Sequence, residues 1–116
     1  MAENVGENKK IQELQIIEQN LQNLMIQKQS FQVELNEIEN ALTELKKSGD
    51  EVYRILGGIM LKAEKPSLIK EMEEKKKIIE IRVSSLEKQE SIFEKKAEEL
   101  REDITSSMKT HQKGKN

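Results

Sequence analysis

The chain has 116 residues, of which 36% are charged and 3% aromatic, and its formal net charge is −2. The chain therefore has few of the bulky side chains that fill a globular core. Its enrichment in Glu, Lys, Leu and Ile favours long helices or a coiled coil, with disorder as the alternative. The absence of cysteine excludes disulfides and a Cys-based metal site. No apolar run approaches a membrane span of about 18 residues, and the N-terminus lacks a signal-peptide core, so we expect a cytoplasmic protein.

The first predicted element is a long helix over residues 10–47. Apolar residues recur there in alternating steps of three and four, and nine of the ten stripe positions are apolar. The stripe consists of Leu14, Ile17, Leu21, Leu24, Lys28, Phe31, Leu35, Ile38, Leu42 and Leu45. This heptad pattern is typical of a coiled-coil helix and argues against disorder.

Residues 52–63, VYRILGGIMLKA, follow the Ser-Gly-Asp of residues 48–50, where Gly49 is expected to cap the first helix. Two β-branched and aliphatic runs flank Gly57-Gly58, which predicts a β-hairpin with a tight primed turn. A two-residue turn determines which residues share a face of the hairpin, and both faces are then largely apolar. One face would carry Val52, Arg54, Leu56, Ile59, Leu61 and Ala63, and the other Tyr53, Ile55, Met60 and Lys62.

Such a hairpin is marginally stable alone and has open edges, so we infer oligomerisation through it. A hairpin packed locally against the helices is the alternative.

A second helix is predicted over residues 66–109, with Pro66 at its first position. Its stripe again steps by three and four, and nine of its twelve positions are apolar. These positions are Ile69, Met72, Lys76, Ile79, Val83, Leu86, Glu90, Phe93, Ala97, Leu100, Ile104 and Ser107. Residues 110–116 are predicted to be a frayed tail.

The two stripes match as an antiparallel pair in which opposing residue numbers sum to 114, although other registers remain possible. All ten layers fit, from Leu14 with Leu100 to Leu45 with Ile69, and no layer pairs two charged residues. Lys28 and Glu90 fall in adjacent layers, where they either form a register-fixing ion pair or both extend to water.

The paired stripes run out near the two termini, which leaves apolar residues without cover there. These residues are Ile11, Leu14, Ile16, Leu100, Ile104 and Met108. Exposed apolar side chains at this end indicate either a binding surface or frayed helix ends.

Motifs for catalysis or cofactors are missing from the sequence. His111 is the single histidine, and Gly57-Gly58 lacks the surrounding pattern of a phosphate loop. Charges of both signs are mixed, without a basic stripe for nucleic acid. We therefore expect no enzyme, no cofactor, no metal, no membrane partner and no nucleic-acid partner.

The order long helix, single hairpin, long helix resembles the beta-type subunit of archaeal prefoldin. The most specific part runs from Glu51 to Glu90, with Val52-Tyr53, the turn glycines and the LEKQE run of residues 86–90. A single hairpin fits the beta class, because alpha-class subunits carry a second. Pro66 departs from the family pattern without changing the predicted helix start.

The resemblance implies an all-α-dominated fold in a single prefoldin-like domain over residues 1–116, a long antiparallel two-helix coiled coil with one β-hairpin at its base. It further implies a heterohexamer of two alpha and four beta subunits, with the hairpins assembled into a β-barrel platform from which coiled-coil arms project. The complex would be an ATP-independent holdase that captures non-native polypeptides at the arm tips and delivers them to a group II chaperonin. The client-binding tip residues would be Ile11, Leu14, Ile16, Ile17, Leu100, Ile104 and Met108. The assembly residues would be Val52, Tyr53, Ile55, Leu56, Gly57, Gly58, Ile59, Met60 and Leu61.

Three other functions compete with this interpretation. A structural coiled-coil tether or oligomerisation protein explains the heptads, but it needs neither a doubly apolar hairpin nor apolar tips. A nucleic-acid-binding arm should show basic residues and aromatics for stacking. A zinc-hook arm would need a Cys pair at the apex, where Gly57-Gly58 stands instead.

Overall fold

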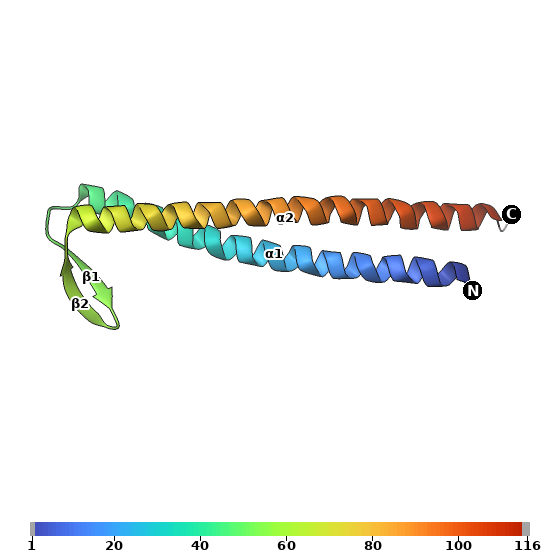
Figure 1. Ribbon diagram of the computed structural model, residues 1–116, viewed down its shortest axis with the longest axis horizontal. Helices are drawn as coiled ribbons and strands as arrows, with labels where there is room; N and C mark the ends of the chain where they lie inside the picture. Colours follow the sequence, from blue (N-terminus) through green and yellow to red (C-terminus); the bar gives the residue numbers. More distant parts are fainter. Residues whose placement is uncertain (1, 115–116) are drawn as a thin grey trace. The chain divides into compact units, whose positions relative to one another are not determined.

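The computed structural model describes the backbone of residues 2–114 and the side chains of residues 6–109. Its elements follow in the order α1 (Ala2–Lys47), β1 (Val52–Leu56), β2 (Ile59–Ala63) and α2 (Lys65–Gly114), as Figure 1 shows. The predicted helix, hairpin, helix order of an all-α-dominated fold is confirmed.

Both helices extend further than the apolar stripes predict. Helix α1 begins at Ala2 rather than at residue 10, and α2 continues to Gly114 rather than ending at residue 109. The predicted tail is therefore helical up to Gly114, and residues 115–116 lie outside the described residues. The stripe marks where two helices pack and does not itself determine where each helix ends.

The start of α2 accommodates its proline within the first turn. The helix begins at Lys65, so Pro66 is its second residue and not its first. The backbone N–H of Leu68 donates to the Glu64 carbonyl at 2.9 Å, which makes this bond one of the first of the helix. Pro66 costs no hydrogen bond there, because N–H groups of the first turn have no partner within the helix.

The end of α1 is capped by side chains rather than by a left-handed glycine. Gly57 and Gly58 are the described residues with positive φ, so Gly49, the expected cap, lacks the left-handed backbone of a glycine C-cap. Instead, Ser48 Oγ donates to the Leu45 carbonyl at 2.8 Å, and Lys65 Nζ donates to the Ser48 carbonyl at 2.7 Å. These two bonds satisfy carbonyls that the helix end leaves open.

The chain divides into two compact units. The terminal unit comprises residues 1–27 and 86–116, and the hairpin unit comprises residues 28–85. The single domain predicted for residues 1–116 stays a prediction.

In the terminal unit, the start of α1 packs against the end of α2, drawn in blue and red in Figure 1. Its core consists of Ile17, Ala97 and Leu100, with Leu14, Leu21 and Phe93 packed around them. These residues are the members of three predicted layers, so the packing agrees with the register in which opposing residue numbers sum to 114.

In the hairpin unit, the end of α1 packs against the start of α2 in the same way. The core residues are Ile38, Leu42 and Ile79, joined by Phe31, Leu35, Ile69, Met72 and Val83. The guanidinium of Arg82 lies over the Phe31 ring, 5.7 Å from its centroid, within the range of a cation–π contact.

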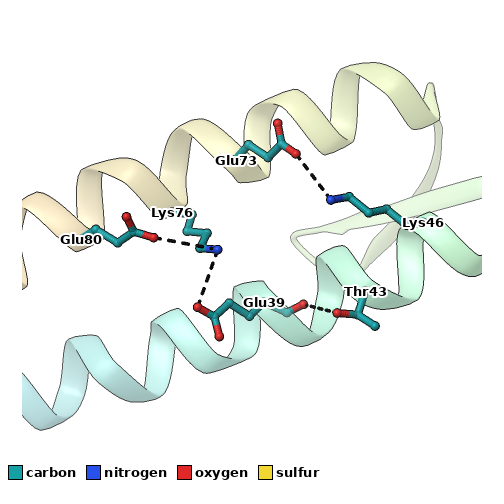
Figure 2. A network of polar contacts seen from close by, with 6 residues as sticks. All are labelled: Glu39, Thr43, Lys46, Glu73, Lys76 and Glu80. Carbon is teal, nitrogen blue, oxygen red and sulfur yellow. Dashed lines mark hydrogen bonds and ion pairs between the residues drawn. The ribbon is translucent and has the colours of Figure 1, made fainter.

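Ion pairs flank the apolar seam of the hairpin unit (Figure 2). Lys76 Nζ lies 3.7 Å from Glu39 and 3.9 Å from Glu80, and Lys46 Nζ lies 3.8 Å from Glu73. Exposed pairs of this kind contribute about 0–1 kcal/mol each, so the seam rather than the charges holds the helices together.

The hypothesised pair of Lys28 and Glu90 would join residues of the two different units, and it stays a hypothesis.

Candidate functional site

The hairpin turn has the backbone conformation that glycine permits. Gly57 has φ of 55° and Gly58 has φ of 80°. A two-residue turn with positive φ at both positions is the primed type that matches the twist of the strands, so the predicted tight primed turn is confirmed. Apart from the adjacent residues of the chain, no atom would lie within 4 Å of a Cβ at either glycine, so the demand for glycine comes from the backbone and not from crowding.

The strand register decides which side chains share a face. Leu56 pairs with Ile59, Ile55 with Met60, and Val52 with Ala63. Alternation then gives the two predicted faces. We call them the Arg54 face (Val52, Arg54, Leu56, Ile59, Leu61 and Ala63) and the Lys62 face (Tyr53, Ile55, Met60 and Lys62).

The Arg54 face is attached to α2 at its helix-side end. Val52 is buried, and the Arg54 guanidinium donates to both oxygens of Glu71, from Nη1 at 3.1 Å and from Nη2 at 3.0 Å. A two-pronged bond of this type has a defined direction as well as a distance, and it links the hairpin to α2 at this point. An open groove of about 190 Å³ beside this bond is lined by Arg54, Lys62, Ala63, Glu64, Ser67, Leu68 and Glu71.

The rest of the hairpin is uncovered in the described part of the chain. The exposed apolar residues are Tyr53, Ile55, Leu56, Ile59, Met60 and Leu61. The sheet contains two strands, so each strand also has one edge without a neighbour among the described residues. Local packing against the helix, the alternative interpretation, accounts for Val52 and Arg54 and leaves both faces near the turn open.

The structure distributes the seven predicted tip residues over three environments. Ile11, Ile16 and Met108 are exposed, while Leu14 and Ile104 are half-buried. Ile17 and Leu100 are buried, with exposed fractions of 6% and 8%. The expectation that Leu100 lies uncovered is therefore wrong, because Ile17 and Ala97 pack into the same cluster.

The positions beside the seam differ between neighbouring heptads of the terminal unit, which the stripe alone does not reveal. Arg101 Nη2 lies 3.2 Å from Glu18 Oε1, a pair in which one residue of each helix flanks the seam. One heptad closer to the termini, the equivalent positions are Ile11 (18 − 7) and Met108 (101 + 7). An apolar pair therefore stands where the neighbouring heptad has an ion pair, and both of its members are exposed.

The described residues offer little for other chemistry. Among them, no group of three or more His, Cys, Asp or Glu side chains is arranged to hold a metal ion. Within the same residues, neither helix has a stretch long and apolar enough to cross a membrane. The side chain of His111 lies outside the described residues.

A comparison with protein families decides the class of the molecule. The family model described as prefoldin subunit matches residues 8–111. The chain belongs to the prefoldin subunit family. The predicted resemblance is thereby confirmed, and so is the predicted chaperone class of the protein. Membership implies assembly with other prefoldin subunits.

Individual prefoldin relatives are archaeal beta subunits. The chain is 38% identical to prefoldin subunit beta of Thermococcus gammatolerans, over 84% of this chain and 85% of the relative. It is 40% identical to that of Archaeoglobus fulgidus, over 69% and 71% of the two chains. The crystal structure of the prefoldin beta subunit from Thermococcus strain KS-1 superposes with a TM-score of 0.83 at 33% identity, covering 88% of this chain and 91% of that one.

Proposed function

We propose that this chain is the beta-type subunit of a cytoplasmic, ATP-independent holdase made of two alpha and four beta subunits. The observation that carries the proposal is the contrast between the apolar stripes of the helices, whose residues are buried or half-buried, and a hairpin that exposes apolar residues on both faces. Among the described residues, the part of the hairpin near the turn has no cover on either face, so neighbouring subunits are the cover.

Assembly through the hairpin follows from its open edges as well as from its faces. In a two-residue hairpin, the pair next to the turn exchanges hydrogen bonds and the following pair does not. Ile55 and Met60 therefore direct their backbone N–H and C=O groups toward the outer edges. Strands of neighbouring subunits satisfy these groups, and a closed β-barrel platform is the arrangement that leaves no edge open.

The hydrophobic effect supplies the energy of this assembly. Full burial of one large aliphatic side chain stabilises by roughly 1.5–3 kcal/mol. Six exposed apolar residues on the strands of each hairpin are enough to drive association, even after the entropy of association is subtracted.

Clients bind, in this proposal, at the terminal unit. Ile11, Ile16 and Met108 offer exposed apolar contacts, and the stripe residues Leu14 and Ile104 are half-buried. Ile17 and Leu100 take part only where the two helices separate. The methionine at this place suits clients of varied sequence, because an unbranched thioether adapts its shape.

Several subunits acting together explain how a weak surface holds a client without nucleotide. One apolar patch of this size contributes a few kcal/mol at about 25 cal/mol per Å² buried. Patches linked in one complex raise the effective concentration of the second and later contacts. Each single contact remains reversible, which permits transfer of the client to a group II chaperonin.

The proposal is tested by measuring mass and activity on one sample. The chain is co-expressed with an archaeal alpha-type prefoldin subunit, and the mass of the complex is measured in solution. The same sample is then added, without ATP, to a diluted unfolded test protein. A six-chain complex that suppresses aggregation is the expected result. A stable two-chain rod without effect on aggregation would show a structural tether instead.

A further inference from the structure

The four methionines whose side chains the structure describes lie in different environments. Met72 is half-buried against the core cluster of the hairpin unit. Met25 on α1 and Met108 on α2 are 50% and 56% exposed, and Met60 on β2 is 66% exposed. Met60 is therefore the most accessible of these methionines to a small reagent in solution.

Met60 also belongs to the apolar surface that assembly has to cover. It pairs across the strands with Ile55, which is itself largely exposed, and it shares the Lys62 face with Tyr53. In a hairpin with a two-residue turn this pair exchanges no hydrogen bonds, and the side chains of such a pair lie close together. A subunit that covers Ile55 therefore covers Met60 as well.

Oxidation would turn this apolar side chain into a polar one. A peroxide delivers one oxygen atom to the thioether: a sulfur lone pair forms the new S–O bond and the peroxide O–O bond breaks. The hydrogen of the transferred oxygen moves to the leaving oxygen, which departs as water. Sulfur loses two electrons, and the peroxide gains them. The product, methionine sulfoxide, is polar and chiral, and methionine sulfoxide reductases return it to the thioether.

A sulfoxide at this position acts on assembly and not on the fold of the chain. In the free subunit its oxygen stays hydrated, because Met60 packs against no helix seam and is exposed. In the complex an apolar surface replaces that water, and a polar group buried without a hydrogen-bond donor is costly. Conversely, once Ile55 and Met60 are covered, a peroxide in solution no longer reaches the sulfur.

We propose that Met60 is a redox-sensitive site that controls entry of this chain into the complex. A peroxide oxidises the Met60 thioether while the hairpin is uncovered, and the sulfoxide then prevents assembly until it is reduced. The inference rests on the proposed function, because it presumes assembly through the hairpin. It adds to that function a check on the chemical state of each subunit before assembly.

The first experiment measures assembly before and after oxidation. The full chain is treated with hydrogen peroxide, the peroxide is removed, and an untreated archaeal alpha-type prefoldin subunit is added. Sedimentation velocity gives the concentration for half-assembly. Met60→Leu removes the sulfur and keeps an apolar side chain of similar volume. Met25→Leu makes the same change at an exposed methionine of α1. Each chain is compared with itself, so any effect of the substitution alone cancels.

Peroxide should raise the half-assembly concentration of the unmodified chain and of Met25→Leu roughly tenfold. It should change that of Met60→Leu by less than about twofold, because no sulfur remains on the hairpin. Treatment of the oxidised chain with both stereospecific sulfoxide reductases should restore assembly. Without any oxidant, Met60→Gln should weaken assembly roughly tenfold by placing a polar group on the same face, whereas Met25→Gln should not.

A second experiment measures whether assembly conceals the sulfur. The free chain and the assembled complex are exposed to the same peroxide concentration, and peptide mass spectrometry gives the rate of sulfoxide formation at each methionine. Met60 should oxidise roughly tenfold more slowly in the complex than in the free chain. Met25, on a helix, is the internal reference and should oxidise at the same rate in both samples.

Three results would overturn the inference. In the first, peroxide weakens the assembly of Met60→Leu as much as that of the unmodified chain. In the second, a chain carrying the sulfoxide at Met60 assembles at an unchanged concentration, as it would if Tyr53 or Lys62 donated to the new oxygen. In the third, Met60 oxidises equally fast in the free chain and in the complex.

Failure of the inference is distinguishable from failure of the proposed function. If the untreated, unmodified chain does not assemble with the alpha-type subunit, the proposed function fails. If untreated Met60→Leu alone does not assemble, the comparison of Met60→Gln with Met25→Gln decides, and equal effects of these two variants overturn the inference. Circular dichroism of each oxidised chain and each variant verifies that the helices are intact.

Discussion

The helix pair and the hairpin use similar aliphatic residues with opposite results. Ile79, in the seam of the hairpin unit, is 3% exposed, whereas Ile55, on the hairpin of the same unit, is 70% exposed. On each helix, the apolar residues of one stripe are covered by the antiparallel partner, while scattered apolar residues outside the stripe stay exposed. The hairpin puts them on both faces, and α2 covers one end of one face. This difference separates what the chain folds by itself from what it leaves for other subunits.

Replacing a seam residue should have the largest effect on the folding of the chain. Ile79→Ala removes a buried side chain and should lower the free energy of unfolding by about 2–5 kcal/mol. Ile78→Ala is the matched control, because Ile78 is adjacent and 53% exposed, and it should change stability by less than about 0.5 kcal/mol. Urea unfolding followed by far-UV circular dichroism measures both. Equal losses would contradict the assignment of the seam.

A substitution in the turn should affect assembly while leaving the helices intact. Gly58→Ala forces an L-residue into left-handed backbone, which costs about 1–2 kcal/mol. The concentration for half-assembly with an alpha-type subunit should rise about tenfold, the equivalent of 1.4 kcal/mol. Gly49→Ala, at a glycine without positive φ, should leave this concentration unchanged. An unaltered half-assembly concentration for Gly58→Ala would mean that the turn conformation is not needed for assembly.

The terminal unit offers two isoleucines of α1 with equal exposure for a test of client capture. Ile16 and Ile26 are both 59% exposed, and Ile16 is the one assigned to the tip. Ile16→Ser should weaken aggregation suppression severalfold, at about 1 kcal/mol per lost contact, with the six-chain mass preserved. Ile26→Ser should have little effect. Titration of the complex against an unfolded test protein measures this, and equal effects would place capture along the helices instead of at their ends.

Removing the Arg54–Glu71 bond should have the smallest effect on the free energy of unfolding. Both side chains are more than a third exposed, so solvent screens the pair and its coupling energy should be about 0–1 kcal/mol. A double-mutant cycle with Arg54→Ala and Glu71→Ala, followed by urea unfolding, gives this energy. A coupling well above 1 kcal/mol would show that the hairpin is held more firmly to α2 than its exposure indicates.

The sequence predicts most of what local periodicity determines. The strand bounds, the primed turn at Gly57-Gly58 and the two hairpin faces follow from alternation and from the conformational preferences of glycine. The layers of the seam follow from steps of three and four, because those steps decide which side chains meet across an antiparallel pair.

Other features depend on contacts that the stripe does not encode. Helix α1 begins at Ala2 and helix α2 ends at Gly114, both beyond the stripe, because the stripe marks only where the two helices pack. Leu100 was expected to lie uncovered because the seam ends near it, but the small Ala97 allows close packing around Ile17. The flanking pair Ile11 and Met108 is recognised by applying the register to positions beside the seam, once the Glu18–Arg101 pair shows which residues face each other there.

Two equally exposed isoleucines of the hairpin unit test most directly whether the hairpin is the assembly surface. Ile55 on β1 is 70% exposed and Ile81 on α2 is 69% exposed. Ile55→Asp and Ile81→Asp are each mixed with an alpha-type subunit, and the mass of the product is measured in solution. Ile55→Asp should abolish the six-chain complex, whereas Ile81→Asp should leave it intact. A six-chain complex that forms with Ile55→Asp as readily as with Ile81→Asp would contradict assembly through the hairpin.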